Sequence, residues 1–269
     1  MSIENIAFII PVHPPKYHYI YDLIHKLEVN HILIDIFLVF SSRQDYDIFT
    51  IKRYIKPIIL EPFQTNSIVT YKKFTALKQL ADSKYEYIIC CDSEIDIIAN
   101  NFTSDNINNK IKQIFDNKKI YAGDTRQKTP RTILQISADI FPHEYNKLKD
   151  ITKDFTLYFW YSDLPVYRRV DILPFLNMLN YDNISYYHFD YMIYQYYLTL
   201  YHNFEIVNTT PITNLDWSLE HLSTTNVNIL NALVDIKYGF GWNDKRLYIR
   251  NKNFIESQKG FIIYHLDRT

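Results

Sequence analysis

The sequence predicts an α/β fold with a mixed, mostly parallel central sheet flanked by helices. Short, nearly continuous apolar runs are typical of buried parallel strands, and segments with helical periodicity lie between these runs. Polar or acidic residues follow the runs, where strand ends would meet a ligand. The predicted order over about the first 100 residues is strand, helix, strand, strand, helix, strand, which favours helices on both faces of the sheet.

The first predicted strand spans residues 6–12 and is almost entirely apolar. A helix follows, and its buried face is formed by apolar residues at helical spacing: Ile20, Leu23, Ile24 and Leu27. A second strand spans residues 34–40. The polar residues behind it, among them Ser41 and Arg43, form either a ligand-facing loop or an ordinary turn.

A third, short strand spans residues 57–60, and a helix follows at 66–82. The apolar stripe of this helix contains Phe74, Leu77 and Ala81. Lys72 and Lys73 on the same helix either reach a ligand or are solvated, as helical lysines commonly are. The fourth strand spans residues 85–91 and runs directly into a group of acidic residues.

Three carboxylates follow the fourth strand: Asp92, Glu94 and Asp96. If the chain stays extended here, alternate residues point to one side and the like charges crowd together. A divalent cation would relieve this repulsion, and Mg²⁺ and Mn²⁺ prefer such oxygen ligands. A strand that simply ends in a polar turn accounts for the same residues.

The bulk properties narrow the classes of function. The chain has 269 residues and no Gly/Ser/Pro-rich linker, so we expect a single domain. Its formal charge of -1 does not favour nucleic-acid binding. Cys90 and Cys91 are neighbours on a predicted strand and cannot readily form a disulfide, which indicates a reducing, cytoplasmic location. No stretch approaches the roughly 20 apolar residues of a transmembrane helix.

Glycine-rich phosphate-binding loops are absent from the sequence. Neither G-x-G-x-x-G nor G-x-x-x-x-G-K-[ST] occurs, which disfavours dinucleotide-dependent enzymes and P-loop kinases. A nucleotide diphosphate could still bind if a metal ion carried the charge of its phosphates.

With these features the chain resembles the glycosyltransferases of the GT-A (Rossmann-like) fold, which use a nucleotide-diphosphate sugar and a divalent metal. The resemblance rests on residues 6–12, on residues 72–77 of the second helix and on residues 87–94. The last segment ends in Asp92-Ser93-Glu94, which matches the D-x-D signature with Glu in place of the second Asp. The match covers about the first 100 residues, and the remainder only by its general layout.

The resemblance implies one domain over residues 1–269, with a nucleotide-binding half at about 1–100 and a sugar- and acceptor-binding half at about 101–269. It implies Mn²⁺ or Mg²⁺ as cofactor, with Asp92, Glu94 and His265 as ligands and Asp96 as the alternative to Glu94. It also implies the following nucleotide-sugar-binding residues: Pro11, Val12, His13, Ser41, Arg43, Lys72, Lys73, Asp92 and Ser93.

The second half offers residues for the sugar and the acceptor. Residues 157–165 combine aromatic side chains with an acid, and sugars stack on rings while carboxylates accept from their hydroxyl groups. We therefore expect Trp160 to contact the donor sugar and Asp163 to act in catalysis, although a core strand with a turn explains this segment equally well.

Asp190 opens another predicted helix, whose buried stripe comprises Phe189, Ile193, Tyr196 and Leu200. The helix dipole favours a carboxylate in the first turn, so Asp190 has a structural explanation. The resemblance instead implies that it is the catalytic base of an inverting enzyme, which takes the proton from the acceptor hydroxyl.

We therefore expect a metal-dependent glycosyltransferase that moves a sugar from a nucleotide-diphosphate donor onto a glycan or another hydroxyl acceptor. The expected donor is a UDP-sugar. One alternative is a sugar-phosphate nucleotidyltransferase, but the loop at residues 11–15 lacks the glycine-rich character of that class. A second alternative is a non-catalytic carbohydrate-binding protein of the same fold.

Overall fold

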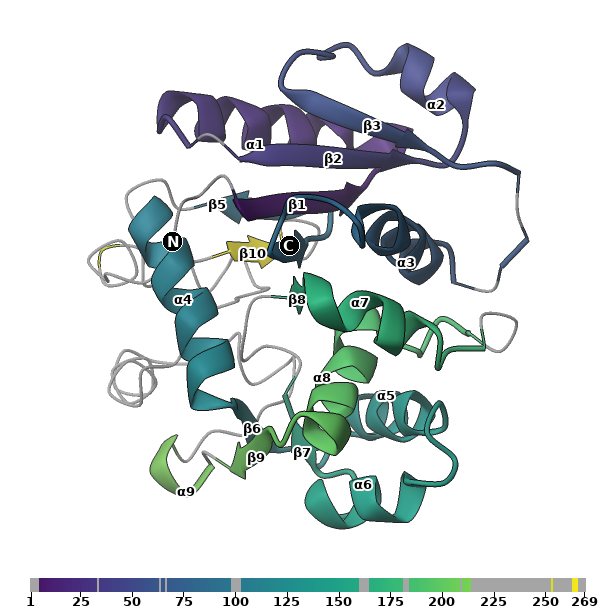
Figure 1. Ribbon diagram of the computed structural model, residues 1–269, viewed down its shortest axis with the longest axis vertical. Coiled ribbons are helices and arrows are strands. Elements are labelled where there is room, and N and C mark those ends of the chain that lie inside the picture. Colours follow the sequence, from purple (N-terminus) through teal and green to yellow (C-terminus); the bar gives the residue numbers. More distant parts are fainter. Residues whose placement is uncertain are drawn as a thin grey trace. The chain divides into compact units, whose positions relative to one another are not determined.

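The computed structural model describes residues 5–32, 34–62, 64–65, 67–97, 103–159, 165–180, 184–208, 210–213, 253 and 263–265 (Figure 1). Its contacts divide the chain into two compact units. The first unit combines Met1–Ala99 with Pro165–Tyr186, and the second combines Asn100–Leu164 with Tyr187–Thr269.

The first unit contains a five-stranded sheet of order β3-β2-β1-β4-β8 (Figure 1). Its strands are β1 (Ile6–Pro11), β2 (Asp35–Phe40), β3 (Ile55–Ile59), β4 (Tyr87–Cys90) and β8 (Val166–Arg168). The first four strands are parallel, and β8 pairs antiparallel with β4. The predicted α/β fold with a mixed, mostly parallel sheet is thus confirmed.

The middle of this sheet lies where the sequence is most apolar. Every residue of β1 is buried, because β1 has β2 on one side and β4 on the other. Backbone pairing continues past the strand ends, where the Val12 N–H donates to the Val39 carbonyl at 3.1 Å and the Cys91 N–H donates to the Ile9 carbonyl at 3.0 Å. The ends of β1 and β4 are therefore held side by side.

Helices connect the parallel strands. The other elements of this unit are η2 (Pro14–Lys16), α1 (Tyr17–Val29), α2 (Arg43–Ile48), α3 (Ile68–Leu80), β5 (Ile95–Ile97) and α7 (Arg169–Leu176). The β1-to-β2 and β3-to-β4 crossovers run in opposite directions, so right-handed connections place α1 and α3 on opposite faces of the sheet. The four predicted apolar residues of α1 are buried, and α3 packs against β1, β2 and α7.

One local expectation for this unit is wrong, and one short helix was not predicted. The chain does not stay extended after β4: Asp92 precedes a turn at Ser93 and Glu94, so the acids do not alternate along one strand. Ser41 and Ser42 form a bend after β2, but Arg43 already belongs to the unpredicted short helix α2, which the Ser42 hydroxyl caps by accepting from the Asp45 N–H at 3.1 Å.

The second unit contains a three-stranded sheet of order β7-β6-β9, in which β6 pairs antiparallel with β7 and parallel with β9. Its elements are α4 (Ser104–Asn117), β6 (Lys119–Asp124), α5 (Lys128–Ala138), α6 (Tyr145–Ile151), β7 (Leu157–Tyr158), α8 (Asp190–Tyr201), β9 (Glu205–Asn208), α9 (Thr210–Thr213) and β10 (Ile263–His265). The expected single buried stripe of α8 is wrong: all residues from Asp190 to Thr199 are buried, whereas Phe189 and Leu200 are partly exposed.

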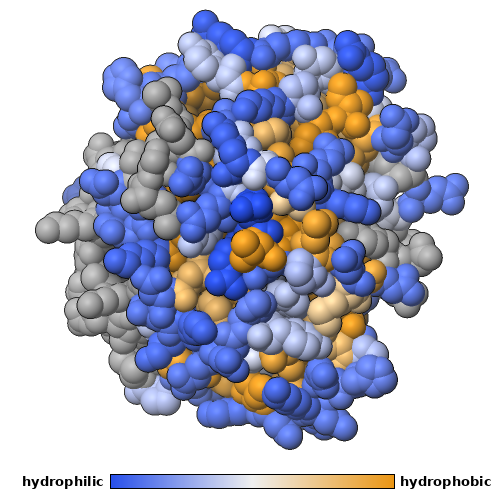
Figure 2. Space-filling view, in the orientation of Figure 1, coloured by the Kyte–Doolittle hydropathy of each residue, from blue (hydrophilic) through white to orange (hydrophobic). Residues whose placement is uncertain are grey.

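The structure also bears on the two cysteines and on the expected lack of a transmembrane helix. Cys90 and Cys91 form no disulfide, as predicted, and both are buried. Within the described residues, no helix combines the length and apolarity needed to cross a bilayer. Figure 2 shows a face on which hydrophilic residues predominate, with apolar residues interspersed among them.

Candidate functional site

The candidate site lies at the carboxyl edge of the first unit's sheet, between β1 and β4. From β1 the chain proceeds to β2 and β3 on one side, and it then returns to β4 on the other side. Open parallel sheets bind ligands at the point where the strand order reverses in this way. Val12 and His13 follow β1 at this point, and Asp92 and Glu94 follow β4.

Two lysines of α3 link these strand ends. The Lys72 ammonium donates to the Val12 carbonyl at 2.5 Å, and the Lys73 ammonium forms an ion pair with Asp92 Oδ1 at 2.8 Å. Both lysines are buried, with 3% and 4% of their surface exposed. The alternative that they are solvated is therefore wrong, because their ammonium groups are directed to Val12 and Asp92 at the strand ends, whereas the exposed side of α3 carries other residues such as Lys78.

A third lysine reaches the same edge from η2. Lys16 follows Pro14 and Pro15, and its ammonium donates to Glu94 Oε1 in an ion pair. The Glu94 side chain is 12% exposed and that of Lys16 is 28% exposed, so this pair is partly shielded from water. The edge thus brings together three ammonium groups and two carboxylates.

Burial and neighbouring charges shift the pKa values of Lys72 and His13 at this edge. Burial lowers the pKa of Lys72 from 10.5 to about 8, although the nearby Asp45 carboxylate acts in the opposite direction. The pKa of His13 is lowered from its usual value of 6.5, first by burial and then by the positive charges of Lys16 and Lys72. His13 is therefore mainly neutral at pH 7, and Lys72 is mainly charged.

A divalent ion fits this arrangement poorly as it stands. Carboxylate oxygens are the right donors for Mg²⁺ or Mn²⁺. However, both candidate ligands in this unit are already in ion pairs, Asp92 with Lys73 and Glu94 with Lys16. Among the residues that the structure describes, no three His, Cys, Asp or Glu side chains gather as a metal site would require.

The other predicted binding residues of this unit lie around the same strand ends. Pro11 is the last residue of β1, and Ser93 is buried in the turn after β4. Ser41 follows β2, whereas Arg43 begins α2 and points its exposed guanidinium to Asp47, at 3.0 Å. The structure thus supports a place near the edge for Pro11 and Ser93 more directly than for Arg43.

Sequence reasoning missed two charged residues of the site. Asp45 acts on the pKa values of Lys72 and His13, and its position depends on α2, whose Ser42-x-x-Asp45 cap could have been read from the sequence. Lys16 follows two prolines in a loop at a strand end, but its pairing with Glu94, 78 positions away, has no local signal.

The remaining predicted residues belong to the second unit. Asp190 is the first residue of α8, as expected, and is 2% exposed. His265 is the last residue of β10, and its side chain lies outside the described part of the structure. Trp160 and Asp163 also lie outside the described residues, so their roles stay predictions.

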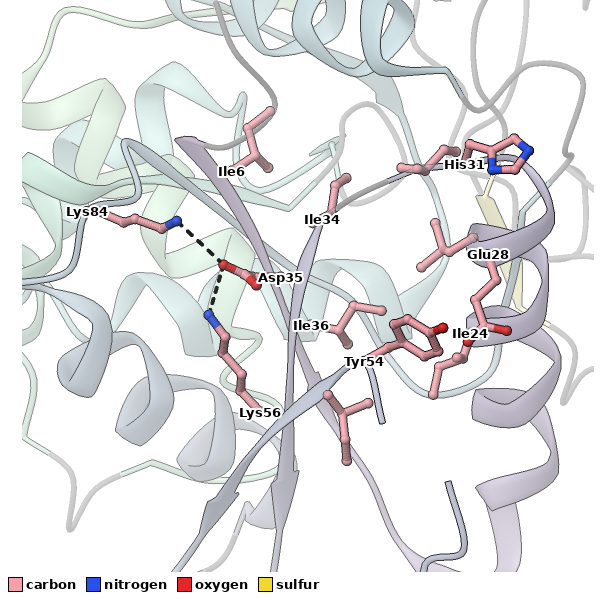
Figure 3. Close-up of a pocket in the computed structure, with 13 residues that line it drawn as sticks. Ile6, Ile24, Glu28, His31, Ile34, Asp35, Ile36, Tyr54, Lys56 and Lys84 are labelled. Atoms are coloured by element: carbon pink, nitrogen blue, oxygen red, sulfur yellow. Dashed lines mark ion pairs between the residues drawn. The ribbon is translucent and has the colours of Figure 1, made fainter. Parts of the chain in front are cut away.

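A separate cavity of about 730 Å³ opens near the starts of β1, β2 and β3, at the amino edge of the sheet (Figure 3). Figure 3 shows Lys56 and Lys84, both paired with Asp35, on one side of the strands and Tyr54 on the other. The polar groups therefore do not converge on one point. We place the candidate site at the carboxyl edge because charged groups from four segments meet there.

The fold and this edge define an α/β protein with a charged site at the reversal of strand order. No protein-family model matches the chain, and the search of curated proteins finds no match either. Its function therefore has to be inferred from its residues.

Proposed function

We propose that the protein transfers a sugar from a nucleotide-diphosphate donor, such as a UDP-sugar, to a glycan or another hydroxyl acceptor. The observation that carries this proposal is that two buried lysines of α3 reach the reversal point between β1 and β4, where Lys72 donates to the Val12 carbonyl and Lys73 pairs with Asp92. Ammonium groups bind phosphate oxygens, and carboxylates accept hydrogen bonds from sugar hydroxyls. A nucleotide-diphosphate sugar carries both kinds of group.

The residues of the edge have distinct roles in this proposal. Val12 and His13 lie beside the nucleotide base, and Asp92 accepts a hydrogen bond from a ribose hydroxyl. The lysines of α3 face the diphosphate, whose negative charge grows as the bond to the anomeric carbon breaks. Cations that are already in position stabilise such a developing charge without reorganisation of solvent.

Asp190 supplies the proton transfer in the proposed reaction. Its carboxylate takes the proton of the acceptor hydroxyl as that oxygen attacks the anomeric carbon, and the nucleotide diphosphate leaves with the bonding electrons. This is an inverting displacement. The proposal for Asp190 rests on its position, since it is a buried carboxylate at the first residue of α8.

The expected Mn²⁺ or Mg²⁺ stays a prediction. An ion bound at this edge would be held by Asp92 and Glu94 and would act as a Lewis acid toward the diphosphate. Because a lysine engages each of these carboxylates, none of the steps above depends on an ion.

The test is an assay of free nucleotide diphosphate after incubation of the protein with a panel of nucleotide sugars and simple glycosides. We expect release from at least one UDP-sugar, and we expect Asp190→Asn to slow transfer by about 10²- to 10⁴-fold while UDP binding is retained. Sugar binding without any turnover would instead favour a carbohydrate-binding protein. Formation of a nucleotide sugar from a nucleoside triphosphate and a sugar phosphate would favour a nucleotidyltransferase.

A further inference from the structure

The charge at the candidate site differs from that of two bare carboxylates. Asp92 and Glu94 alone would carry a charge of -2 and repel a diphosphate, which is why such a pair normally needs a divalent ion. Here the ammonium groups of Lys16, Lys72 and Lys73 change that balance to +1. With Asp45 included, the described charged groups named here sum to zero, so they do not add the repulsion that the bare carboxylate pair would exert on an anionic ligand.

The two ion pairs also oppose the binding of an ion. A divalent cation at Asp92 would lie next to the ammonium of Lys73, which pairs with Asp92 Oδ1 and is 4% exposed. The two positive charges would repel each other and would be poorly screened. An ion at Glu94 would meet the ammonium of Lys16 in the same way.

Within the described part of the chain, the Lys72 ammonium forms no ion pair, and the Asp45 carboxylate acts on its pKa only from beyond ion-pair distance. The Lys72 ammonium is buried and donates to the Val12 carbonyl, and the group can donate three hydrogen bonds in all. A buried ammonium is costly unless it is paired with a charge, and a bound anion would supply that charge. Its carbonyl partner lies at the end of β1, where the reversal point is.

The start of α3 adds to the positive potential. This helix has 13 residues and follows β3, so its first turn lies at the carboxyl edge of the sheet. Lys72 and Lys73 stand in the next turn. Backbone N–H groups at a helix start and nearby ammonium groups attract phosphate together.

From these observations we infer that Lys72 and Lys73, assisted by Lys16, bind the diphosphate of the donor directly, and that donor binding needs no divalent ion. This inference rests on the proposed function, since it specifies how the donor of that reaction is held. In the ligand-free protein, Asp92 and Glu94 hold two of these ammonium groups in position.

The first experiment is calorimetric titration of the full chain with UDP, once in EDTA and once in Mg²⁺ or Mn²⁺. We expect the two dissociation constants to agree within about threefold, because the lysines supply the charge. Binding that occurs only with the metal would overturn the inference and leave the proposed function intact. If UDP binds under neither condition and no nucleotide sugar is hydrolysed, both fail.

Variants then test which residues carry the binding. In EDTA, Lys72→Met should weaken UDP binding by at least about 10-fold, the usual loss for a hydrogen bond to a charged group. Lys78→Met is the matched control, since Lys78 is exposed on the same helix. The affinity of this variant for UDP should equal that of the wild type. Equal affinities for the two variants would contradict the inference, provided that thermal melting shows both folded. If a variant does not fold, the titrations of the wild-type protein in EDTA and in Mg²⁺ or Mn²⁺ still test the inference.

Pyrophosphate binding distinguishes a diphosphate held by lysines from one held by a metal ion, because Asp92→Asn has opposite effects in the two cases. Asp92→Asn removes a negative charge next to Lys73, so pyrophosphate binding in EDTA should be unchanged or tighter. A metal site at Asp92 would lose its ligand, and pyrophosphate binding in Mg²⁺ or Mn²⁺ would then fall. That second result would overturn the inference.

Discussion

At the scale of single residues, the buried lysines of α3 are the feature that distinguishes this protein from an ordinary α/β domain. Lys73 is compensated by Asp92, but Lys72 has a carbonyl as its described partner and lies in a site that lowers its pKa to about 8. A methionine of similar length would avoid this cost. A group that costs stability at a strand-end site is a candidate for function.

Replacing Lys72 by Met should therefore stabilise the fold at neutral pH. The folded protein binds the lysine proton less tightly than the unfolded chain, so the cost is fully present below pH 8 and is relieved as the pH rises from about 8 toward 10.5. Allowing for the lost hydrogen bond, we expect Lys72→Met to raise the free energy of unfolding by about 1–2 kcal/mol at pH 7.

Urea unfolding at pH 7 and near pH 10 measures this effect. The gain should shrink at the higher pH, and Lys78→Met, which removes an exposed ammonium from the same helix, should change the free energy by less than about 0.5 kcal/mol. A loss of stability in Lys72→Met at both pH values would show that the charged form is well solvated or paired.

At the scale of elements, the end of α1 shows how this glycine-poor chain makes its turns. His31 has a left-handed φ of 53°, and its N–H donates to the Glu28 carbonyl at 3.0 Å. The Ile32 N–H donates to the Leu27 carbonyl at 3.0 Å, which completes a Schellman cap. A position that usually takes glycine is thus occupied by a β-carbon-bearing residue, at a steric cost.

The substitution His31→Gly should stabilise the protein by about 1 kcal/mol, because glycine adopts the left-handed conformation without that cost. For a chain of this size we expect the melting temperature to rise by about 2–4 °C. His25→Gly is the matched control: His25 is an exposed residue in the middle of α1, where glycine should cost about 0.5–1 kcal/mol. A decrease in melting temperature for both variants would contradict a steric cost at His31.

At the scale of the whole molecule, the first unit is discontinuous in sequence. Residues 165–186 return to it, where β8 covers the edge of β4 and α7 packs against α3. Phe175 of α7 contacts Phe74 of α3 edge-on, with ring centroids 5.6 Å apart. The helix that carries the two buried lysines is therefore completed by a segment distant in sequence.

A fragment of residues 1–99 should consequently fail to fold cooperatively, because the β4 edge and one side of α3 become exposed. Joining residues 165–186 to this fragment through a flexible Gly/Ser linker should restore a cooperative urea transition. Circular dichroism and size-exclusion chromatography of the two fragments provide the comparison. A shorter fragment that is monomeric and as stable as the longer one would show that β8 and α7 are dispensable.

Strongly periodic elements were predicted well. The segments that became β1, α1, β2 and α3 were placed within a few residues because apolar spacing is a local property of the chain. Short elements were missed: α2 depends on one capping hydroxyl, and β8 depends on pairing with a strand that lies far away in sequence. At the site, the position of Asp92 after β4 was predicted, whereas its partner Lys73 and the pairing of Glu94 with Lys16 were not.

The sequence by itself determined the α/β class, the central strands and the placement of acids behind β4, because hydrophobic periodicity and strand-end polarity act over a few residues. Only the tertiary structure decided that Lys72 and Lys73 are buried and that lysines engage both carboxylates. Burial of a helix face depends on what packs against it, and here α7 comes from about 100 positions further along the chain. Electrostatic pairing likewise depends on distances in space, which spacing along the sequence does not encode.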